Sequence, residues 1–205
     1  MQNSQKKTQN KKITKIAFDI DGVLCDFNSE YIKRVNSTFN LNIDPNKIPS
    51  YDYISDLLGQ EKADDFFALE ISRGLFADCL PYPEAQIFMF NLLADNKHEV
   101  YFITARGTEK GICWDSRLHS KMVSDTRSWL KENFPNFNQA NLIFSGRKDE
   151  TIYKNNIQLM VEDKKSTAEA LTDLCKSVLL TRSWNTGDTT AIRVSSIAEV
   201  GFLLK

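Results

Sequence analysis

The sequence predicts an α/β fold in which helices flank a parallel β-sheet. Short runs of β-forming residues recur along the chain, helical patterns separate most of them, and polar residues stand directly after several runs. Strands that alternate with helices usually lie parallel in one sheet. Ligands of such sheets bind beyond the carboxyl ends of the strands, so the residues at those ends are the first candidates for a site.

Five strands and two core helices are expected from these patterns. The strands are expected at residues 15–20, 99–104, 141–144, 158–162 and 177–181. One helix is expected over residues 83–93, because Pro83 suits the first helical position, and another over residues 125–133.

One long interval interrupts the alternation. Residues 28–80 separate the first strand from the Pro83 helix and contain helical patterns near 29–39 and 61–71. Structureless loops longer than about 15 residues are uncommon in compact domains. We therefore expect a core of residues 13–27 and 81–205, with a compact helical insertion at 28–80 that covers the mouth of the sheet and selects substrates.

Composition favours an ordinary globular protein of about one domain. The 205 residues are 41% hydrophobic and 26% charged, and no apolar run approaches the ~20 residues of a membrane span. Residues 1–15 hold five lysines and no acid, while the remainder is mildly acidic, so neither a nucleic-acid groove nor a membrane partner is expected. Residues 1–12 are expected to form a disordered lysine-rich tail, because they lack the apolar region of a signal peptide.

The cysteine pattern indicates the compartment. The four cysteines are scattered and none is paired in a C-x-x-C motif, so neither a disulfide framework nor a zinc site is expected. A reducing cytoplasm fits this pattern best.

The strongest functional signal is a pair of acids after the first strand. Asp19 and Asp21 stand two residues apart and would repel each other unless a positive group held them, for which Mg²⁺ with oxygen ligands is the best candidate. Asp19 could attack a phosphorus atom as a nucleophile, and Asp21 could serve as general acid and base. Gly22 lets the backbone pass close to a ligand. For an isolated Asp-Gly pair, a simple turn would be the better interpretation.

Phosphate-binding groups are expected at the end of the second strand. Thr104 offers a hydroxyl there, and the amides of Ala105 and Arg106 can point at an anion. A structural role for the threonine is the alternative, since threonine is common in strands. The basic residues between 106 and 121 could touch phosphate or sugar, or could equally form a solvated loop.

A lysine and two further acids complete the candidate set. Lys148 opens a helix after the third strand and could neutralise the nucleophile, with Lys154 as the competing candidate and a solvated lysine as the alternative. Glu162 and Asp163 end the fourth strand. Residues 166–169 read as a capping box, so both acids precede the cap and are free to bind a metal together with Asp19 and the Asp21 backbone carbonyl.

These residues resemble the four ordered motifs of the haloacid dehalogenase superfamily over most of the chain. The matching segments are Asp19-Ile20-Asp21-Gly22-Val23, Thr104, Lys148 and Glu162-Asp163. The resemblance implies a Rossmann-like core with a small helical cap inserted after the first strand.

It also implies a role for each matching residue. Asp19 would be the nucleophile and a metal ligand, and Asp21 the general acid and base. Thr104 would bind phosphate and Lys148 would stabilise charge. Asp163 would be the metal-binding acid, although Glu162 stands where many members have Asp and leaves that choice open.

A narrower resemblance concerns the cytosolic 5′(3′)-deoxyribonucleotidase-type family. It depends on the segments at 19–27, 103–106, 161–164 and 182–185, the last of which reads Arg-Ser-Trp-Asn. It implies a cytoplasmic Mg²⁺-dependent phosphomonoesterase, a 5′-nucleotidase-like enzyme that dephosphorylates nucleoside 5′-monophosphates. Another small phosphate ester, such as a sugar phosphate, is the alternative substrate, and the oligomeric state stays open.

Several aromatic residues could stack on a base. Tyr51, Tyr53, Phe66 and Phe67 lie in the expected insertion, and Trp114 follows the second strand. A small helical insertion also needs aromatic residues for its own core, so a core role is the alternative for each of them.

Three other functions share part of this residue pattern. A phospho-receiver signalling domain also gathers acids, a threonine and a lysine, but it is shorter and takes its phospho-acceptor from a middle strand. A dehalogenase of the same fold would need neither Asp21 nor a metal. A binding protein that has lost catalysis is disfavoured, because every expected chemical position is filled.

Overall fold

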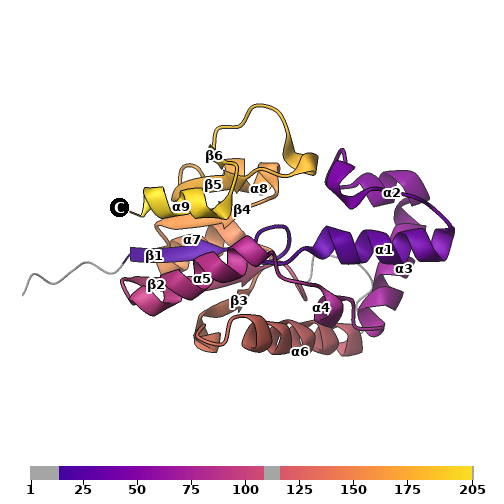
Figure 1. The fold of residues 1–205 in the computed structure, drawn as a ribbon, viewed down its shortest axis with the longest axis horizontal. Coiled ribbons are helices and arrows are strands. Elements are labelled where there is room, and N and C mark those ends of the chain that lie inside the picture. The colour runs from indigo at the N-terminus through magenta and orange to yellow at the C-terminus, as the bar shows by residue number, and fades with distance from the viewer. Residues whose placement is uncertain (1–13, 109–115, 205) are drawn as a thin grey trace, which may run out of the picture.

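The computed structural model describes residues 14–108 and 116–204, and six of its segments form one parallel sheet. The strand order across the sheet is β3-β2-β1-β4-β5-β6, and every pairing is parallel (Figure 1). The strands are β1 (Thr14–Phe18), β2 (His98–Thr104), β3 (Leu142–Phe144), β4 (Leu159–Glu162), β5 (Lys176–Leu180) and β6 (Ile192–Val194). The predicted parallel sheet is confirmed. The predicted tail and Trp114 lie outside the described residues.

The five expected strands are present with small shifts at their ends. β1 ends at Phe18, so Ile20 belongs to the following loop, although the Asp19 amide still donates to the Val161 carbonyl at 2.9 Å and continues the ladder for one residue. β6 was not predicted. Its three residues at the sheet edge are too few to show a periodic pattern.

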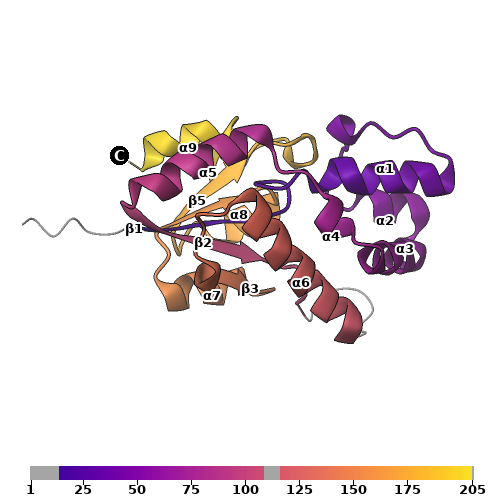
Figure 2. The ribbon, with the colours of Figure 1, turned by 60° about the horizontal axis from the view of Figure 1, so that its bottom comes forward.

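Helices cover both faces of the sheet, as the fold class requires. On one face, Phe18 and Phe102 pack with residues of α5 (Pro83–Asp95), α6 (Ser116–Asn133) and α9 (Ile197–Leu203). On the other face, Ala17 and Ile103 pack near α7 (Lys148–Asn155), and Leu179 packs on α8 (Lys165–Ala170). Figure 2 shows α5 and α9 above the sheet and α7 below it.

Two helix predictions need correction. The helix expected at residues 125–133 is much longer, because α6 begins at Ser116. The capping box expected at residues 166–169 is wrong: α8 begins at Lys165 after Lys164 and has no side-chain cap, so Ser166 lies inside the helix. Glu162 and Asp163 nevertheless precede the helix, as expected. Pro83 does occupy the start of α5.

The residues between β1 and α5 form helices that lie to one side of the sheet (Figure 1). They are α1 (Phe27–Phe39), η1 (Pro45–Lys47), α2 (Tyr53–Leu58), α3 (Gln60–Ser72) and α4 (Leu75–Asp78), called the insertion helices below. They share a hydrophobic cluster of their own, which contains Val35 and Phe66. No helix among the described residues is long and apolar enough to cross a membrane.

Arg34 joins three of the insertion helices. Its guanidinium donates to Glu30 on α1 at 2.8 Å, to Glu70 on α3 at 2.8 Å and to Asp78 on α4 at 2.5 Å. Glu70 is only 4% exposed, and Arg73 is its other cationic partner. Arg34 therefore compensates a buried charge as well as linking helices.

We predict that Arg34→Met destabilises the protein by about 3 kcal/mol, because it leaves the Glu70 carboxylate buried with one partner fewer. Urea unfolding of the variant measures this loss. In the matched double variant, Arg34→Met with Glu70→Gln, the buried charge is also removed and part of the stability should return. A loss below about 0.5 kcal/mol in the single variant, typical of surface substitutions, would show that the network is only a surface feature.

Candidate active site

Asp19 lies in a buried ion cluster beyond the carboxyl ends of β1 and β4. The Lys148 ammonium lies 2.9 Å from Asp19 Oδ1 and 2.5 Å from Glu162 Oε1. The Ile20 amide also donates to Asp19 Oδ1, at 2.8 Å. All three of these ionisable residues are less than 10% exposed. The first residue of α7 therefore bridges a carboxylate from each of two neighbouring strand ends.

This geometry resolves the choice between two lysines. Lys148 reaches Asp19, whereas Lys154 lies further along α7 and is exposed to solvent. Of the two, only Lys148 contacts the acids at the strand ends.

Asp21 is held by Arg106. The Arg106 Nε and Nη2 atoms donate to the two Asp21 carboxylate oxygens at 2.8 and 2.5 Å, and Nη1 donates to Thr126. The guanidinium is also stacked over the Phe76 ring, 4.2 Å from its centroid. Because Arg106 is 5% exposed, the solvated loop considered for this residue is wrong.

Thr104 ends β2, and Ala105 follows it. Thr104 is 1% exposed, and its Oγ1 accepts the Arg106 amide at 3.2 Å. Ala105 is exposed, and its carbonyl accepts the Thr108 hydroxyl at 2.9 Å. The segment thus forms a tight turn after the strand, and phosphate binding by Thr104 and the following amides stays a prediction.

Asp163 lies against Gly22, which explains the glycine. A Cβ atom at Gly22 would lie 2.2 Å from Asp163 Oδ2, and the backbone there has a φ of 71°, which favours glycine. The Trp184 Nε1–H donates to the same Asp163 oxygen at 2.9 Å. The close approach that requires Gly22 is therefore to a second acid of the site.

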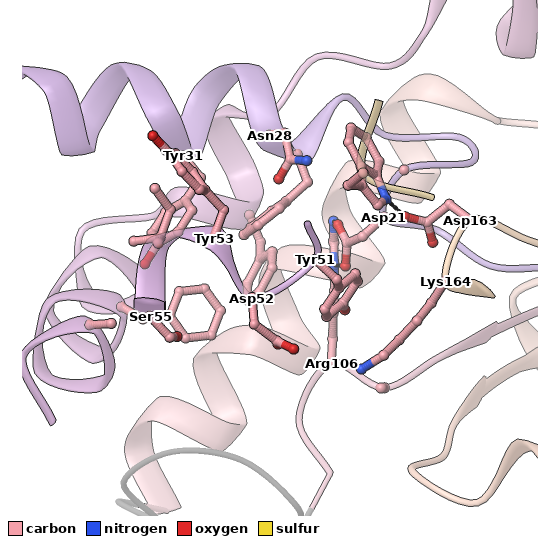
Figure 3. A pocket seen from close by; sticks show the side chains of 18 of the residues that line it. Asp21, Asn28, Tyr31, Tyr51, Asp52, Tyr53, Ser55, Arg106, Asp163 and Lys164 are labelled. Carbon is pink, nitrogen blue, oxygen red and sulfur yellow. Dashed lines mark hydrogen bonds and ion pairs between the residues drawn. The ribbon is translucent and has the colours of Figure 1, made fainter. Parts of the chain in front are cut away.

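A cavity of about 610 Å³ opens beside these residues. Asp21, Arg106 and Asp163 line one end, and the insertion helices supply Tyr31 and Tyr53 at the other (Figure 3). Asp19 and Lys148 are not among the described lining residues, but Asp19 belongs to the same acidic group as Asp163, which does line the cavity. Away from this end the lining mixes aromatic side chains with aliphatic and polar ones, so it offers rings on which a flat apolar group attached to an anionic one can pack.

The aromatic residues that were candidates for stacking on a base divide into those that line the cavity and one that is buried in the hydrophobic cluster. Tyr51, Tyr53 and Phe67 line the cavity, and the Tyr51 ring lies 4.0 Å from the Lys164 ammonium. Phe66 is 5% exposed and belongs to the hydrophobic cluster of the insertion helices.

The acids at the strand ends carry more negative charge than the protein compensates. Asp19, Glu162 and Asp163 can bring their oxygens within 4.8 Å of one another, and the only cation that contacts them among the described ion pairs is Lys148. Burial lowers the pKa of the Lys148 ammonium, but Asp19 and Glu162 outweigh it and raise that pKa above its ordinary value. Two negative charges are therefore uncompensated when the acids ionise.

Burial and the neighbouring acids raise the pKa values of two of these carboxyl groups. Burial raises the pKa of Asp19 well above its ordinary value; Lys148 opposes this, while Glu162 and Asp163 add to it. Burial and the neighbouring Glu162 likewise raise the pKa of Asp163 to about 7, against the effect of the Trp184 hydrogen bond. A divalent cation would remove the repulsion, and an all-oxygen donor set suits Mg²⁺.

The predicted metal ligands are only partly brought together. Asp19, Glu162 and Asp163 converge, but the Asp21 carboxylate is occupied by Arg106 and lies outside that group. A contribution from the Asp21 backbone carbonyl stays a prediction.

Sequence reasoning missed the bonds that the supporting residues make to the acids. It did not identify the Arg106 bond to Asp21 or the Trp184 bond to Asp163, which join residues 85 and 21 positions apart. The narrower family resemblance did include residues 103–106 and 182–185, but it did not indicate which acid Arg106 or Trp184 contacts.

We predict that Mg²⁺ stabilises the protein more at pH 8 than at pH 5. With a native pKa of about 7 and an ordinary value of 3.8, the Asp163 carboxyl makes the metal-free protein less stable as pH rises between these values. A bound cation removes that penalty above pH 7, whereas below it the cation competes with a proton. At a Mg²⁺ concentration 100 times the dissociation constant, binding adds about 2.7 kcal/mol to the free energy of unfolding. For a protein of this size, that corresponds to a rise in Tm of about 5–10 °C at pH 8.

Asp163→Asn is the matched control, because it keeps the side-chain shape and removes the charge. In EDTA at pH 8 it should melt above the wild type and respond little to Mg²⁺. Equal Mg²⁺ responses at both pH values, or a full response in the variant, would contradict a cation site here.

Comparison with solved structures establishes the fold. A haloacid dehalogenase-like hydrolase from Streptococcus pneumoniae is 12% identical, with a TM-score of 0.62 over 93% of this chain and 98% of that one. A haloacid dehalogenase-like hydrolase from Bacteroides fragilis is 13% identical, with a TM-score of 0.61 over 92% and 100%. A HAD-family hydrolase from Deinococcus radiodurans, whose structure has bound phosphate and sodium, is 13% identical, with a TM-score of 0.56 over 95% of this chain and 96% of that one. At such identities the likeness concerns the fold alone.

Sequence comparison identifies the family. No match was found among curated proteins. The profile of the family described as "5′ nucleotidase, deoxy (Pyrimidine), cytosolic type C protein" matches residues 11–205, which is nearly the whole chain. The protein therefore belongs to this 5′-nucleotidase family and is a hydrolase with the haloacid dehalogenase fold.

Proposed function

We propose that the protein is a Mg²⁺-dependent phosphomonoesterase that acts through a phosphorylated Asp19, with nucleoside 5′-monophosphates as substrates. The observation that carries the proposal is the buried cluster in which Asp19 contacts Lys148 beside Glu162 and Asp163. Family membership supports the substrate class.

The first chemical step is a displacement at phosphorus. An Asp19 oxygen forms a bond to phosphorus as the ester P–O bond breaks, and the leaving alcohol oxygen takes a proton from Asp21. In the second step Asp21 takes a proton from water as the water oxygen attacks the same phosphorus, which releases phosphate and regenerates Asp19. The carboxylate thus divides one difficult displacement into two easier ones.

Arg106 fixes the proton carrier. Its fork holds both Asp21 oxygens, so the carboxylate has a defined orientation at the end of the cavity. When Asp21 carries a proton, it loses the negative charge that strengthens its bonds from Arg106, so these bonds weaken.

Lys148 and the acids prepare the nucleophile. The Lys148 ammonium compensates the Asp19 charge and is itself held by Glu162, which leaves Asp163 as the acid free of a cationic partner among the described ion pairs. Asp19 and Asp163 would hold Mg²⁺, which when bound lowers the repulsion between the nucleophile and an anionic phosphate. The Thr104 hydroxyl and the Ala105 amide would bind phosphate oxygens, whereas the Arg106 amide already donates to Thr104 Oγ1.

The cavity supports a nucleoside as the leaving group. Its acidic end adjoins the reacting residues, and Phe27, Tyr31, Tyr53 and Phe67 line it further out. A base can stack on such rings, whereas a sugar phosphate would leave them uncovered. A sugar phosphate is therefore the second candidate substrate.

A substrate panel tests the proposal. Nucleoside 5′-monophosphates, 3′-monophosphates, sugar phosphates and an aryl phosphate are assayed for phosphate release with Mg²⁺ and with EDTA. We predict turnover of 5′-monophosphates with Mg²⁺ alone, and a loss of at least about 10³-fold in kcat for Asp19→Asn, because the nucleophile is removed. Its Tm should stay at or above that of the wild type, since a buried charge is lost.

Each contrary outcome has a distinct meaning. Sugar phosphates turned over in preference to every nucleotide would overturn the substrate class. Activity on a haloacid that persists in EDTA would replace the phosphatase by a dehalogenase. Substantial turnover by Asp19→Asn would exclude the covalent route.

A further inference from the structure

We propose, resting on the function proposed above, that Trp184 is a positioning residue that presents the Asp163 carboxylate to the divalent cation. Trp184 lies in η3 (Ser183–Asn185), directly after β5 and beside the end of β4. It also lines the cavity.

The indole and Gly22 enclose one oxygen of Asp163. The Trp184 Nε1–H donates to Oδ2 at 2.9 Å, and the Gly22 backbone passes close to the same atom. An oxygen held between a donor and the backbone gives the carboxylate one orientation, so its remaining lone pairs face in fixed directions. Without the N–H donor, the Asp163 side chain could rotate to other rotamers.

The segment that carries Trp184 also anchors the backbone on both sides of this contact. Asn185 Nδ2 donates to the Asp163 carbonyl at 2.6 Å and to the Leu180 carbonyl at 2.8 Å. Arg182 Nε donates to the Gly22 carbonyl at 2.7 Å, while its guanidinium lies 4.1 Å from the centroid of the Tyr82 ring. The indole is therefore fixed relative to both Asp163 and Gly22.

The ring of Trp184 also contacts the insertion helices. It packs against their hydrophobic cluster, and η3 packs against η1. The next residue after Asp163 makes a parallel link, because the Lys164 ammonium lies over the Tyr51 ring. The packing of the insertion helices is thus connected through one side chain to the orientation of a metal-binding acid.

A phenylalanine at position 184 lacks the indole N–H but keeps an aromatic ring, so it separates the hydrogen bond to Asp163 from the packing of the ring. We predict that Trp184→Phe weakens Mg²⁺ binding about 10-fold, since residues that orient metal ligands typically contribute 10–100-fold to affinity. Titration calorimetry measures the dissociation constant directly. The Mg²⁺ concentration for half-maximal activity should rise by the same factor, while kcat at saturating Mg²⁺ changes less than threefold.

Trp129→Phe is the matched control. Trp129 Nε1 donates to the Cys79 carbonyl at 2.7 Å in the main core, so this variant also loses one indole N–H bond, but one that does not involve Asp163, and phenylalanine keeps an aromatic ring beside Arg106. It should lower the Tm of the metal-free protein and leave the Mg²⁺ dissociation constant within twofold of the wild type. Trp184→Phe should instead raise the Mg²⁺ dissociation constant and leave the Tm of the metal-free protein near that of the wild type.

The outcomes separate the positioning role from the proposed function. Wild-type affinity in Trp184→Phe, or equal weakening in both tryptophan variants, would overturn the positioning role. Weaker binding in Trp184→Phe alone would support it even if no phosphate ester were turned over, a result that would instead overturn the proposed function.

Discussion

Mutual repulsion among carboxylates is the constraint on which the rest of the site depends. Parallel strands bring Asp19, Glu162 and Asp163 to one edge of the sheet, where burial makes their charges costly. Lys148 compensates one charge, and burial together with the neighbouring acids raises the pKa values of Asp19 and Asp163. A site with this imbalance is suited to a divalent cation and, through it, to an anionic substrate.

The surrounding residues convert that charge cluster into defined geometry. Arg106 fixes Asp21, and Trp184 fixes Asp163, each through hydrogen bonds to a carboxylate. Both supporting side chains also touch aromatic residues of the insertion helices or their cluster: Arg106 lies over Phe76, and Trp184 packs beside the cluster. The helices that line the cavity are therefore in contact with the residues that orient the chemistry.

The sequence predicted the fold class and the convergence of the acids because both follow from local patterns. Asp19, Glu162 and Asp163 stand at the ends of strand-like runs, and the carboxyl ends of the strands in a parallel sheet share one edge. The pairing of Arg106 with Asp21 could not be predicted, because it depends on how a turn after β2 approaches a loop after β1. The choice of Lys148 over Lys154 likewise needed the orientation of α7, and β6 was too short to be seen.

The most direct test of the account is whether phosphate becomes attached to Asp19 during turnover. Protein mixed with a radiolabelled phosphate ester and Mg²⁺ is quenched in acid within milliseconds, digested and sequenced by mass spectrometry. The account predicts a hydroxylamine-sensitive phosphate on the peptide that contains Asp19, and no label in Asp19→Asn. Product release from the wild type with no label on Asp19, or with the label on another residue, would contradict it.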